Sequence, residues 1–210
     1  MRKTVGIFGG TFDPVHYGHL RSVLEVKTIF DLREVRLIPS AQPPHRQQPT
    51  TSALMRMEML KLAIKNQTGL LVDAREINRE GPSYMLDTLT SLRHEFTTEP
   101  LLLFIGSDAF NQLTTWYKWQ QLFDHAHIVV LTRPGFDSQI LDDFFTERLT
   151  NKITELAHNL AGKLYFQQVS QLDISASAIR EMIAEQQDPG FLLPDTVIAY
   201  IRQHRLYQGQ

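Results

Sequence analysis

The stretch that decides the fold is Gly9-Gly10-Thr11-Phe12-Asp13-Pro14-Val15-His16-Tyr17-Gly18-His19. It follows an apolar run at residues 3–8 that is typical of a β-strand, and it leads into a helical pattern over residues 17–30. A glycine turn between a strand and a helix lets phosphates approach the backbone, and the helix start adds unpaired N–H groups and a positive dipole end. The stretch therefore predicts an anion site at the carboxyl end of a first strand.

Two histidines of this stretch, His16 and His19, are three residues apart. If the helix begins here, they share one face and can point at one anion, with Gly18 leaving room between them. The loop is neither a Walker A loop, which needs Gly-Lys-Ser/Thr, nor a dinucleotide-binding Gly-x-Gly-x-x-Gly pattern. The alternative is that both histidines only decorate a helix start, but their place after a Gly-Gly turn favours the phosphate site.

Outward from this stretch, short β-branched runs alternate with helical windows, which is typical of an α/β protein with an open parallel sheet flanked by helices. We expect further strands at residues 34–39, 69–74, 101–105, 127–131 and 164–169, and helices at residues 52–66, 83–96, 175–185 and 195–204. Residues 40–51 read as a loop, and residues 137–162 are helical but weakly patterned. We expect one domain over residues 1–210, with room for a small helical C-terminal subdomain from about residue 137.

Composition narrows the classes of function. The chain has 210 residues, of which 42% are hydrophobic and 21% charged, and its net charge of −2 argues against general electrostatic binding to nucleic acid. It has no cysteine, which excludes disulfides, thiol nucleophiles and Cys-ligated zinc. No apolar run is long enough for a signal peptide or a membrane span, so we expect a cytoplasmic protein without a membrane partner. Homo-oligomerisation stays open.

A second candidate anion site lies near the C-terminus, at Ile174-Ser175-Ala176-Ser177-Ala178-Ile179-Arg180. Ser175 can cap the helix that starts here, while Ser177 and the first N–H groups can bind an anion. Arg180, about one turn further on, can donate to two phosphate oxygens. Taken alone, the segment is as well explained by a simple cap with a surface arginine.

Together, the two segments resemble the signatures of the nucleotidyltransferase superfamily with His-x-Gly-His motifs, the second of which reads Ile-Ser-x-Ser/Thr-x-Ile-Arg. The resemblance implies a Rossmann-like fold and catalytic roles for His16, His19 and Arg180, which stabilise charge on ATP as pyrophosphate leaves. It also implies ATP contacts at Gly9, Gly10, Thr11, Phe12, Gly18, Ile174, Ser175 and Ser177. No covalent enzyme intermediate is formed in that superfamily.

Several intermediate segments resemble one branch, the bacterial nicotinate-nucleotide adenylyltransferases. Pro43-Pro44-His45-Arg46 is similar to their Pro-Pro-His-Lys loop, and Gly81-Pro82-Ser83-Tyr84-Met85-Leu86-Asp87-Thr88 is similar to their Pro-Ser-Tyr-Thr-x-Asp-Thr segment. Gly106-Ser107-Asp108 resembles their site for the adenosine part of ATP, and Trp116-Tyr117 and Arg133-Pro134-Gly135 match further landmarks. The resemblance spans nearly the whole chain, including Leu193-Pro194 and Leu206-Tyr207 near its end.

The substrate of that branch, nicotinate mononucleotide, suits these residues. Trp116 can stack on a pyridine ring, although core filling is the alternative. The resemblance implies that backbone N–H groups near Tyr84-Met85 and Tyr117 bind the carboxylate of the ring. The same segment includes Ser83, which can also cap the helix expected at residues 83–96. His45, Arg46 and Arg133 are candidates for binding the mononucleotide, and either arginine could instead be a surface charge. Asp108 can accept from ribose hydroxyls or cap a helix.

Two departures from the pattern concern the preference for acid over amide. Met85 stands where relatives commonly carry Thr, so a hydroxyl contact is lost while a backbone donor survives. Arg46 replaces the more usual Lys and presents a wider, planar donor.

The chemistry expected is in-line attack by the phosphate of nicotinate mononucleotide on the α-phosphorus of ATP. It needs positioning and charge stabilisation more than a strong base. Mg²⁺ is the expected cofactor, bridging ATP phosphates without a protein cage. The alternatives are another acceptor, such as nicotinamide mononucleotide, phosphopantetheine or a small alcohol phosphate, a non-catalytic nucleotide sensor, or an RNA-binding protein.

Overall fold

The computed structural model describes residues 3–42, 49–132, 142–170 and 172–208. Its strands are β1 Val5–Gly10, β2 Glu34–Pro39, β3 Leu70–Val72, β4 Leu101–Gly106, β5 His127–Thr132 and β6 Leu164–Gln168. The longer helices are α1 Tyr17–Ile29, α2 Ala53–Ile64, α3 Met85–Glu95, α8 Ala176–Ala184 and α9 Asp195–Gln203. Each of these elements was expected from the sequence.

The six strands form one parallel sheet in the order β3-β2-β1-β4-β5-β6. Because β1 pairs with β2 on one side and β4 on the other, the strand order reverses at β1. Ligands of open α/β sheets bind at such a reversal, outside the carboxyl ends of the strands. The α/β class with a Rossmann-like parallel sheet is confirmed.

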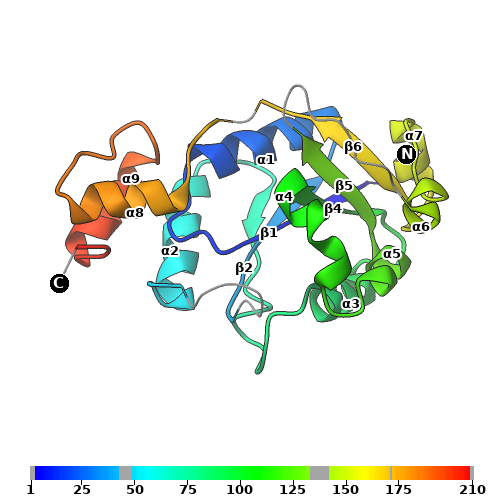
Figure 1. Cartoon of the computed structure of the whole chain (residues 1–210), viewed down its shortest axis with the longest axis horizontal. Coiled ribbons are helices and arrows are strands. Elements are labelled where there is room, and N and C mark those ends of the chain that lie inside the picture. Colours follow the sequence, from blue (N-terminus) through cyan, green and yellow to red (C-terminus); the bar gives the residue numbers. More distant parts are fainter. Residues whose placement is uncertain (1–2, 43–48, 133–141, 171, 209–210) are drawn as a thin grey trace.

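Alternating side chains of the strands build two hydrophobic clusters, one on each face of the sheet. In β4, Leu102 and Phe104 face α1, α2, α8 and α9, whereas Leu101, Leu103 and Ile105 face α3 and the short helices before β5. Strands that are covered on both faces read as continuous apolar runs, which is why 101–105 is recognisable in the sequence. Figure 1 shows the helices on either side of the sheet.

The chain between β4 and β5 contains short elements that the sequence pattern did not reveal. These are α4 Ser107–Asn111, the 3-10 helices η1 Leu113–Thr115 and η2 Trp119–Gln121, and α5 Leu122–His125. The weakly patterned region further on contains α6 Asp143–Thr146 and α7 Ile153–His158. Helices of four to six residues are too short for an amphipathic period to develop, so only their buried aromatic and leucine side chains mark them.

Helices α8 and α9 lie beside α2 at the left of Figure 1. Their buried residues Ile179, Val197, Ile198 and Ile201 belong to the same cluster as Val23 and Val26 of α1 and Met59 and Leu60 of α2. The C-terminal helices therefore pack on the main sheet layer through a shared apolar cluster, and this places α8 next to the end of β1.

Candidate active site

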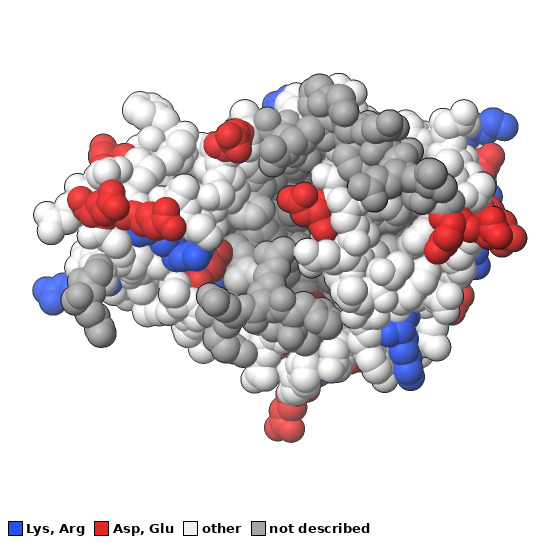
Figure 2. Space-filling model, viewed as in Figure 1, with Lys and Arg blue, Asp and Glu red and all other residues white. Residues whose placement is uncertain are grey.

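The carboxyl end of β1 opens into residues 9–19, which we call the histidine loop. In register, Gly10 lies beside Pro39 at the end of β2, and the Ser40 N–H donates to the Gly10 carbonyl at 2.9 Å. Phe12 has a φ of 52°, in the left-handed region, and the Asp13–Pro14 peptide bond is cis. Figure 2 shows this face hollowed near its centre, in the region where Figure 1 labels β1 and β4, with an acidic side chain at the rim of the hollow.

The two histidines come together at the start of α1, as the spacing predicted. His16 is the N-cap residue and His19 follows in the first turn, so that their ring centroids are 3.8 Å apart. The His16 N–H donates to His19 Nδ1 at 3.4 Å, which leaves the Nε2 side of His19 as its N–H donor. Phe12 packs edge-on against the His19 ring at 5.1 Å and fixes its orientation.

His16 is a buried, neutral imidazole. Its residue is 6% exposed, and burial lowers its pKa to about 4, because an imidazolium loses its hydration there. Its Nδ1 is buried and pairs with no group among the described residues. A buried polar atom without a hydrogen-bond partner is costly, so His16 Nδ1 has the capacity to bond a ligand or a water molecule. His16 is thus poised to act as a neutral hydrogen-bonding group.

Gly18 lies where the two signatures meet. A Cβ on Gly18 would lie 3.0 Å from His16 Nδ1 and Cε1 and 3.5 Å from the carbonyl oxygen of Ile174. A side chain at this position would therefore displace the His16 ring. The lack of a side chain at Gly18 therefore lets the histidine loop pack closely against residue 174 at the start of the second signature.

The second signature is built as expected. Ser175 caps α8 by accepting from the Ala178 N–H at 3.1 Å. Arg180 donates from Nη2 to Ser177 Oγ at 3.2 Å and from Nη1 to the Asp13 carbonyl at 2.7 Å. The reading of a solvated surface arginine is wrong, since Arg180 is half-buried and binds the backbone of the histidine loop. The two segments that the sequence singled out therefore meet in one place.

Asp13 is a junction of the histidine loop. Its residue is 4% exposed, and its Oδ2 accepts from the N–H and Oγ1 of Thr50, both at 3.0 Å. Its Oδ1 accepts from the Tyr207 hydroxyl at 2.6 Å. Both carboxylate oxygens are therefore occupied by protein donors, and Asp13 ties together the loop, the approach to α2 and the C-terminal segment.

A buried arginine lies under the loop. Arg56 of α2 is 1% exposed and donates to three backbone carbonyls, Thr11 at 2.6 Å, Ser40 at 2.7 Å and Thr51 at 3.0 Å. Burial lowers its pKa and the negative charge of Asp13 opposes that shift. The guanidinium thus fixes the ends of the two central segments that follow β1 and β2.

The residues expected at the adenosine part of ATP follow β4. Gly106 is exposed, nothing lies within 4 Å of the position where its Cβ would be, and it is the N-cap of α4. Ser107 and Asp108 form the first turn of that helix. The alternative that Asp108 is the N-cap is wrong, because the chain turns into the helix two residues earlier; the exposed carboxylate is therefore not used for capping.

The residues expected around the pyridine ring lie beside the histidine loop. The Tyr84 and Tyr117 rings lie 4.6 Å apart, which joins the segment before α3 to the loop after η1. A Cβ on Gly9 would meet Met85 Cε at 2.9 Å, so Met85 packs over the end of β1. Trp116 is partly buried against the apolar cluster of the α3 face, which leaves part of its ring exposed and reconciles core filling with stacking.

Ser83 has a different role from the helix cap that its sequence position suggested. The N-cap of α3 is Tyr84, and Ser83 Oγ accepts from the N–H groups of Ala41 and Gln42 at 3.0 and 3.1 Å. Ser83 therefore fastens the Tyr84-Met85 segment to the chain that follows β2. His45, Arg46 and Arg133, predicted to bind the mononucleotide, lie outside the described residues.

Three structurally important residues escaped the sequence reasoning. The sequence motifs contain Asp13 and Tyr207 but predict no role for either, and Arg56 lies outside the motifs. Arg56 had a usable signal, because it falls on the same helical face as buried Met59, Leu60 and Ile64. A charge at a core position of an amphipathic helix indicates that it is paired or hydrogen-bonded.

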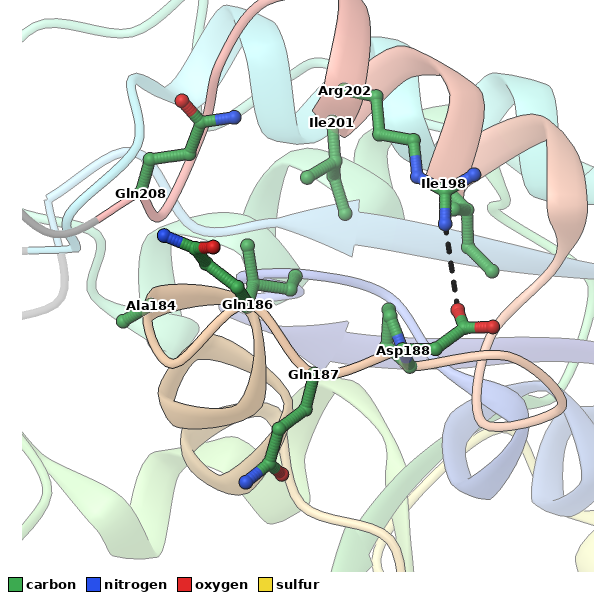
Figure 3. A pocket seen from close by; sticks show the side chains of 10 residues that line it. Ala184, Gln186, Gln187, Asp188, Ile198, Ile201, Arg202 and Gln208 are labelled. Carbon is green, nitrogen blue, oxygen red and sulfur yellow. Dashed lines mark hydrogen bonds and ion pairs between the residues drawn. The ribbon is translucent and has the colours of Figure 1, made fainter.

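Other features of the described chain bear on what binds here. A cavity of about 560 Å³ opens between the end of α8 and α9, with Ile183, Ile198 and Ile201 in its walls and Arg202 ion-paired to Asp188 at 3.4 Å (Figure 3). Since its one cation is neutralised, it is unlike a phosphate site. Across the described residues, no cluster of three or more histidine or acidic side chains is arranged for a metal ion. Among the described helices, none is both long and apolar enough to cross a membrane.

The fold and the site define a nucleotidyltransferase of the cytidylyltransferase-like family, whose model matches residues 7–182. A protein of Methylococcus capsulatus described as a probable nicotinate-nucleotide adenylyltransferase is 46% identical over 97% of this chain and 99% of its own. One of Aeromonas salmonicida with the same description is 40% identical over 100% of this chain and 99% of its own. The chain belongs to the family of nicotinate-nucleotide adenylyltransferases.

A distant solved structure has the same fold. The nicotinic acid mononucleotide adenylyltransferase of Plasmodium falciparum, in complex with APC, superposes with a TM-score of 0.73 at 18% identity, covering 98% of this chain and 97% of that one. A second structure of that protein, in complex with NaAD, gives a TM-score of 0.71. At this identity the likeness supports the architecture alone.

Proposed function

We propose that this enzyme transfers the adenylyl group of ATP to nicotinate mononucleotide, a step of NAD biosynthesis, and that His16, His19 and Arg180 carry the charge stabilisation. An oxygen of the mononucleotide phosphate forms a bond to the α-phosphorus, and the bond from that phosphorus to the bridging oxygen breaks. Deamido-NAD and pyrophosphate are the products. Membership of the family, at 46% identity over nearly the full chain, supports the reaction.

The observation that carries the residue roles is the convergence of the three side chains on one loop. His16 and His19 lie with ring centroids 3.8 Å apart at the start of α1, and Arg180 donates to the same loop from α8. His16, whose pKa is lowered to about 4 by burial, donates or accepts as a neutral ring. The positive charge therefore comes from Arg180 and from the dipole of α1. Fixed donors of this kind stabilise a phosphoryl transition state without reorganising.

ATP extends from this loop across the end of the sheet. Gly9, Gly10, Thr11, Phe12 and Gly18 form the backbone cradle for its phosphates, with Ile174, Ser175 and Ser177 at the start of α8 completing it. Gly106, Ser107 and Asp108 after β4 receive the adenosine part, and Asp108 accepts from ribose hydroxyls. The exposed, uncrowded position of Gly106 supports a close approach by the nucleoside.

Mg²⁺ is proposed as the ion that accompanies ATP. The carboxylate nearest the loop, Asp13, already uses both oxygens for Tyr207 and Thr50, so it suits hydrogen bonding better than metal coordination. An ion held by ATP phosphates and water fits this donor set. When bound, it neutralises charge on the phosphates; the chain itself supplies the histidines, Arg180 and the backbone N–H groups.

Nicotinate mononucleotide occupies the side of the loop toward α3. Its pyridine ring stacks on Trp116, and its carboxylate accepts from backbone N–H groups near Tyr84-Met85 and Tyr117. Ser83 supports this segment by anchoring it to Ala41 and Gln42. We assign the mononucleotide phosphate to Arg46 and Arg133, and His45 to the same mononucleotide-binding site. Because Met85 packs on Gly9, its side chain leaves recognition of the carboxylate to the backbone.

We further propose that the chain acts in the cytoplasm as one domain. Its C-terminal helices share an apolar cluster with α1 and α2, which supports a single folding unit from residue 1 to 210 rather than an independent helical subdomain after residue 137. Whether copies associate is decided by measuring the mass in solution.

The first test is pyrophosphate release from ATP and Mg²⁺, with nicotinate or nicotinamide mononucleotide as acceptor. We expect kcat/KM to favour nicotinate by at least about tenfold, since a site built for a carboxylate leaves donors unpaired with an amide. Met85→Thr should increase that preference, and Met85→Leu, which keeps the packing on Gly9 without a hydroxyl, should not. A preference for the amide would mean that the acceptor is nicotinamide mononucleotide. If neither acceptor gives pyrophosphate release, the result would favour another phosphate acceptor or a non-catalytic sensor.

A further inference from the structure

The carboxylate of Asp13 lies in a site that must bind a triphosphate, and this calls for a physical explanation. A buried carboxylate beside a polyanion repels it unless other groups neutralise or occupy the carboxylate. Arg56 supplies a positive charge close by, and three donors from Thr50 and Tyr207 occupy the two oxygens. The carboxylate is thereby turned from a repelling charge into a fixed acceptor that holds the loop.

Tyr207 is the donor that comes from farthest away in the sequence. Its hydroxyl reaches Asp13 Oδ1 at 2.6 Å across a separation of 194 residues, and its ring packs against the apolar cluster beside α1. Burial and the negative charge of Asp13 both raise the pKa of Tyr207, so the hydroxyl keeps its proton and stays a donor. Its backbone φ of 62° is in the left-handed region, which a non-glycine residue adopts at a cost.

The same segment of the loop carries the contact of Arg180. Arg180 donates to the backbone carbonyl of Asp13, and Tyr207 donates to its side-chain carboxylate. Two residues near the C-terminus therefore bind Asp13, one through its backbone and one through its side chain. A third contact, from the Tyr17 N–H to the Leu192 carbonyl at 2.9 Å, joins the start of α1 to the chain before α9. Asp13 therefore sets the position of Arg180 relative to the two histidines.

We propose that Tyr207 is a positioning residue for ATP: by holding the Asp13 carboxylate, its hydroxyl fixes the histidine loop and Arg180 in the geometry that receives the triphosphate. This inference rests on the proposed function and adds a residue that does not touch the substrate. Its effect is specific to ATP, because nicotinate mononucleotide binds on the other side of the loop and carries a single phosphate.

The test compares Tyr207→Phe with Tyr200→Phe, a matched control in α9. Both lose one hydroxyl, and Tyr200 packs on His204 rather than on the histidine loop. We expect Tyr207→Phe to raise the KM for ATP and the Kd for α,β-methylene ATP about tenfold, while the KM for nicotinate mononucleotide changes less than about twofold. Tyr200→Phe should match wild type in all three. The analogue binding is measured without turnover, so it decides the inference even if wild type fails to use nicotinate mononucleotide.

A double variant shows whether Tyr207 acts through Asp13. If it does, Tyr207→Phe in the background of Asp13→Ala adds no further loss of affinity for the analogue, because residue 13 then has no side-chain oxygen to accept from the hydroxyl. Additive losses would overturn the inference, as would a Tyr207→Phe protein with wild-type affinity for ATP. Equal losses for ATP and mononucleotide with a lowered Tm would also overturn it, since that is a general structural effect. Should Tyr207→Phe fail to fold, Thr50→Val removes another donor to the same carboxylate and is judged by the same criteria.

Discussion

Two buried histidines lie at opposite ends of the strands of the sheet, His16 beyond the carboxyl end of β1 and His127 at the amino end of β5. Both have a pKa lowered to about 4, with burial as the main cause. They differ in their hydrogen bonds. His127 Nδ1 accepts from the Lys163 N–H at 3.0 Å and its Nε2 lies 3.0 Å from the Asn159 carbonyl, whereas His16 Nδ1 has no partner among the described residues.

The comparison teaches that a perturbed pKa does not by itself distinguish a functional histidine from a structural one. Burial lowers the pKa of both histidines alike, but of the two, His16 alone has a ring nitrogen that pairs with none of the described residues. An imidazole ring whose two nitrogens are both hydrogen-bonded within the protein has no capacity left for a ligand, so its role is structural. An unsatisfied atom has that capacity, and its cost is offset when a ligand arrives.

The largest expected effect separates the two histidines by activity. His16→Ala or His19→Ala should lower kcat by about 10² to 10³, because each removes a group that we propose stabilises the transferred phosphate, while Tm changes little. His127→Ala should lower Tm and leave kcat and both KM values near wild type. Steady-state pyrophosphate release and thermal melts measure both. Near-normal turnover in both loop variants would remove the roles assigned to these histidines.

The second largest effect concerns two arginines that donate to backbone carbonyls at opposite ends of the sheet's strands. Arg56 holds Thr11, Ser40 and Thr51, and Arg93 of α3 holds the carbonyls of His125, Phe96, Glu99 and Leu160 at 2.6 to 3.1 Å. Replacing either by Met should reduce the free energy of unfolding by about 3 kcal/mol, because several carbonyls lose their partner.

Only one of these variants should also affect ATP. Arg56→Met leaves Asp13 without its nearby positive charge and should weaken binding of α,β-methylene ATP, measured by titration at a temperature where the protein is folded. Arg93→Met should bind the analogue as wild type does. The same loss of affinity in both would mean that ATP binding follows stability and not the local geometry of the loop.

The smallest effect is in the pH dependence of stability. Since both histidines have a folded pKa of about 4 against an ordinary value of 6.5, their contribution is complete above about pH 6.5 and is lost as the pH falls toward 4. Each reduces the free energy of unfolding by up to about 1.4 kcal/mol per pH unit in that window. Urea unfolding at pH 7, 6 and 5 should show a shallower slope for His127→Gln than for wild type. An unchanged slope would mean that His127 is charged in the folded protein.

The fold could be predicted because its main strands and helices are long enough to show a clear hydrophobic pattern in the sequence. The continuous apolar runs of β4 and β5 and the amphipathic α1 mark a parallel sheet, and the glycine turn before His16 marks the ligand edge. The short helices after β4 could not be predicted in this way, because four or five residues span only about one turn and an apolar pattern cannot repeat within it. Their positions are set by packing of residues such as Phe110 and Phe123 on the sheet.

Residues of the candidate site could be predicted where they belong to a local sequence motif. They were missed where their role depends on residues far away in the sequence. His16, His19 and Arg180 were found from local motifs. Ser83 and Asp108 were both expected to be able to cap helices, but the N-caps are Tyr84 and Gly106, and caps are fixed by the path of the chain. The pairing of Tyr207 with Asp13 left no local pattern, because a hydrogen bond across 194 residues is set by the folded chain.

The bond between Asp13 and Tyr207 also has a consequence for synthesis of the chain on the ribosome. Residue 13 is made early, and the strands β1 to β5 can all emerge before Tyr207, the donor to its Oδ1 atom, exists. Domains gain structure as they emerge, from the N-terminus onward. The sheet and the completed histidine loop are therefore assembled at different times, and a nascent chain with an ordered sheet still lacks the tyrosine that fixes its loop.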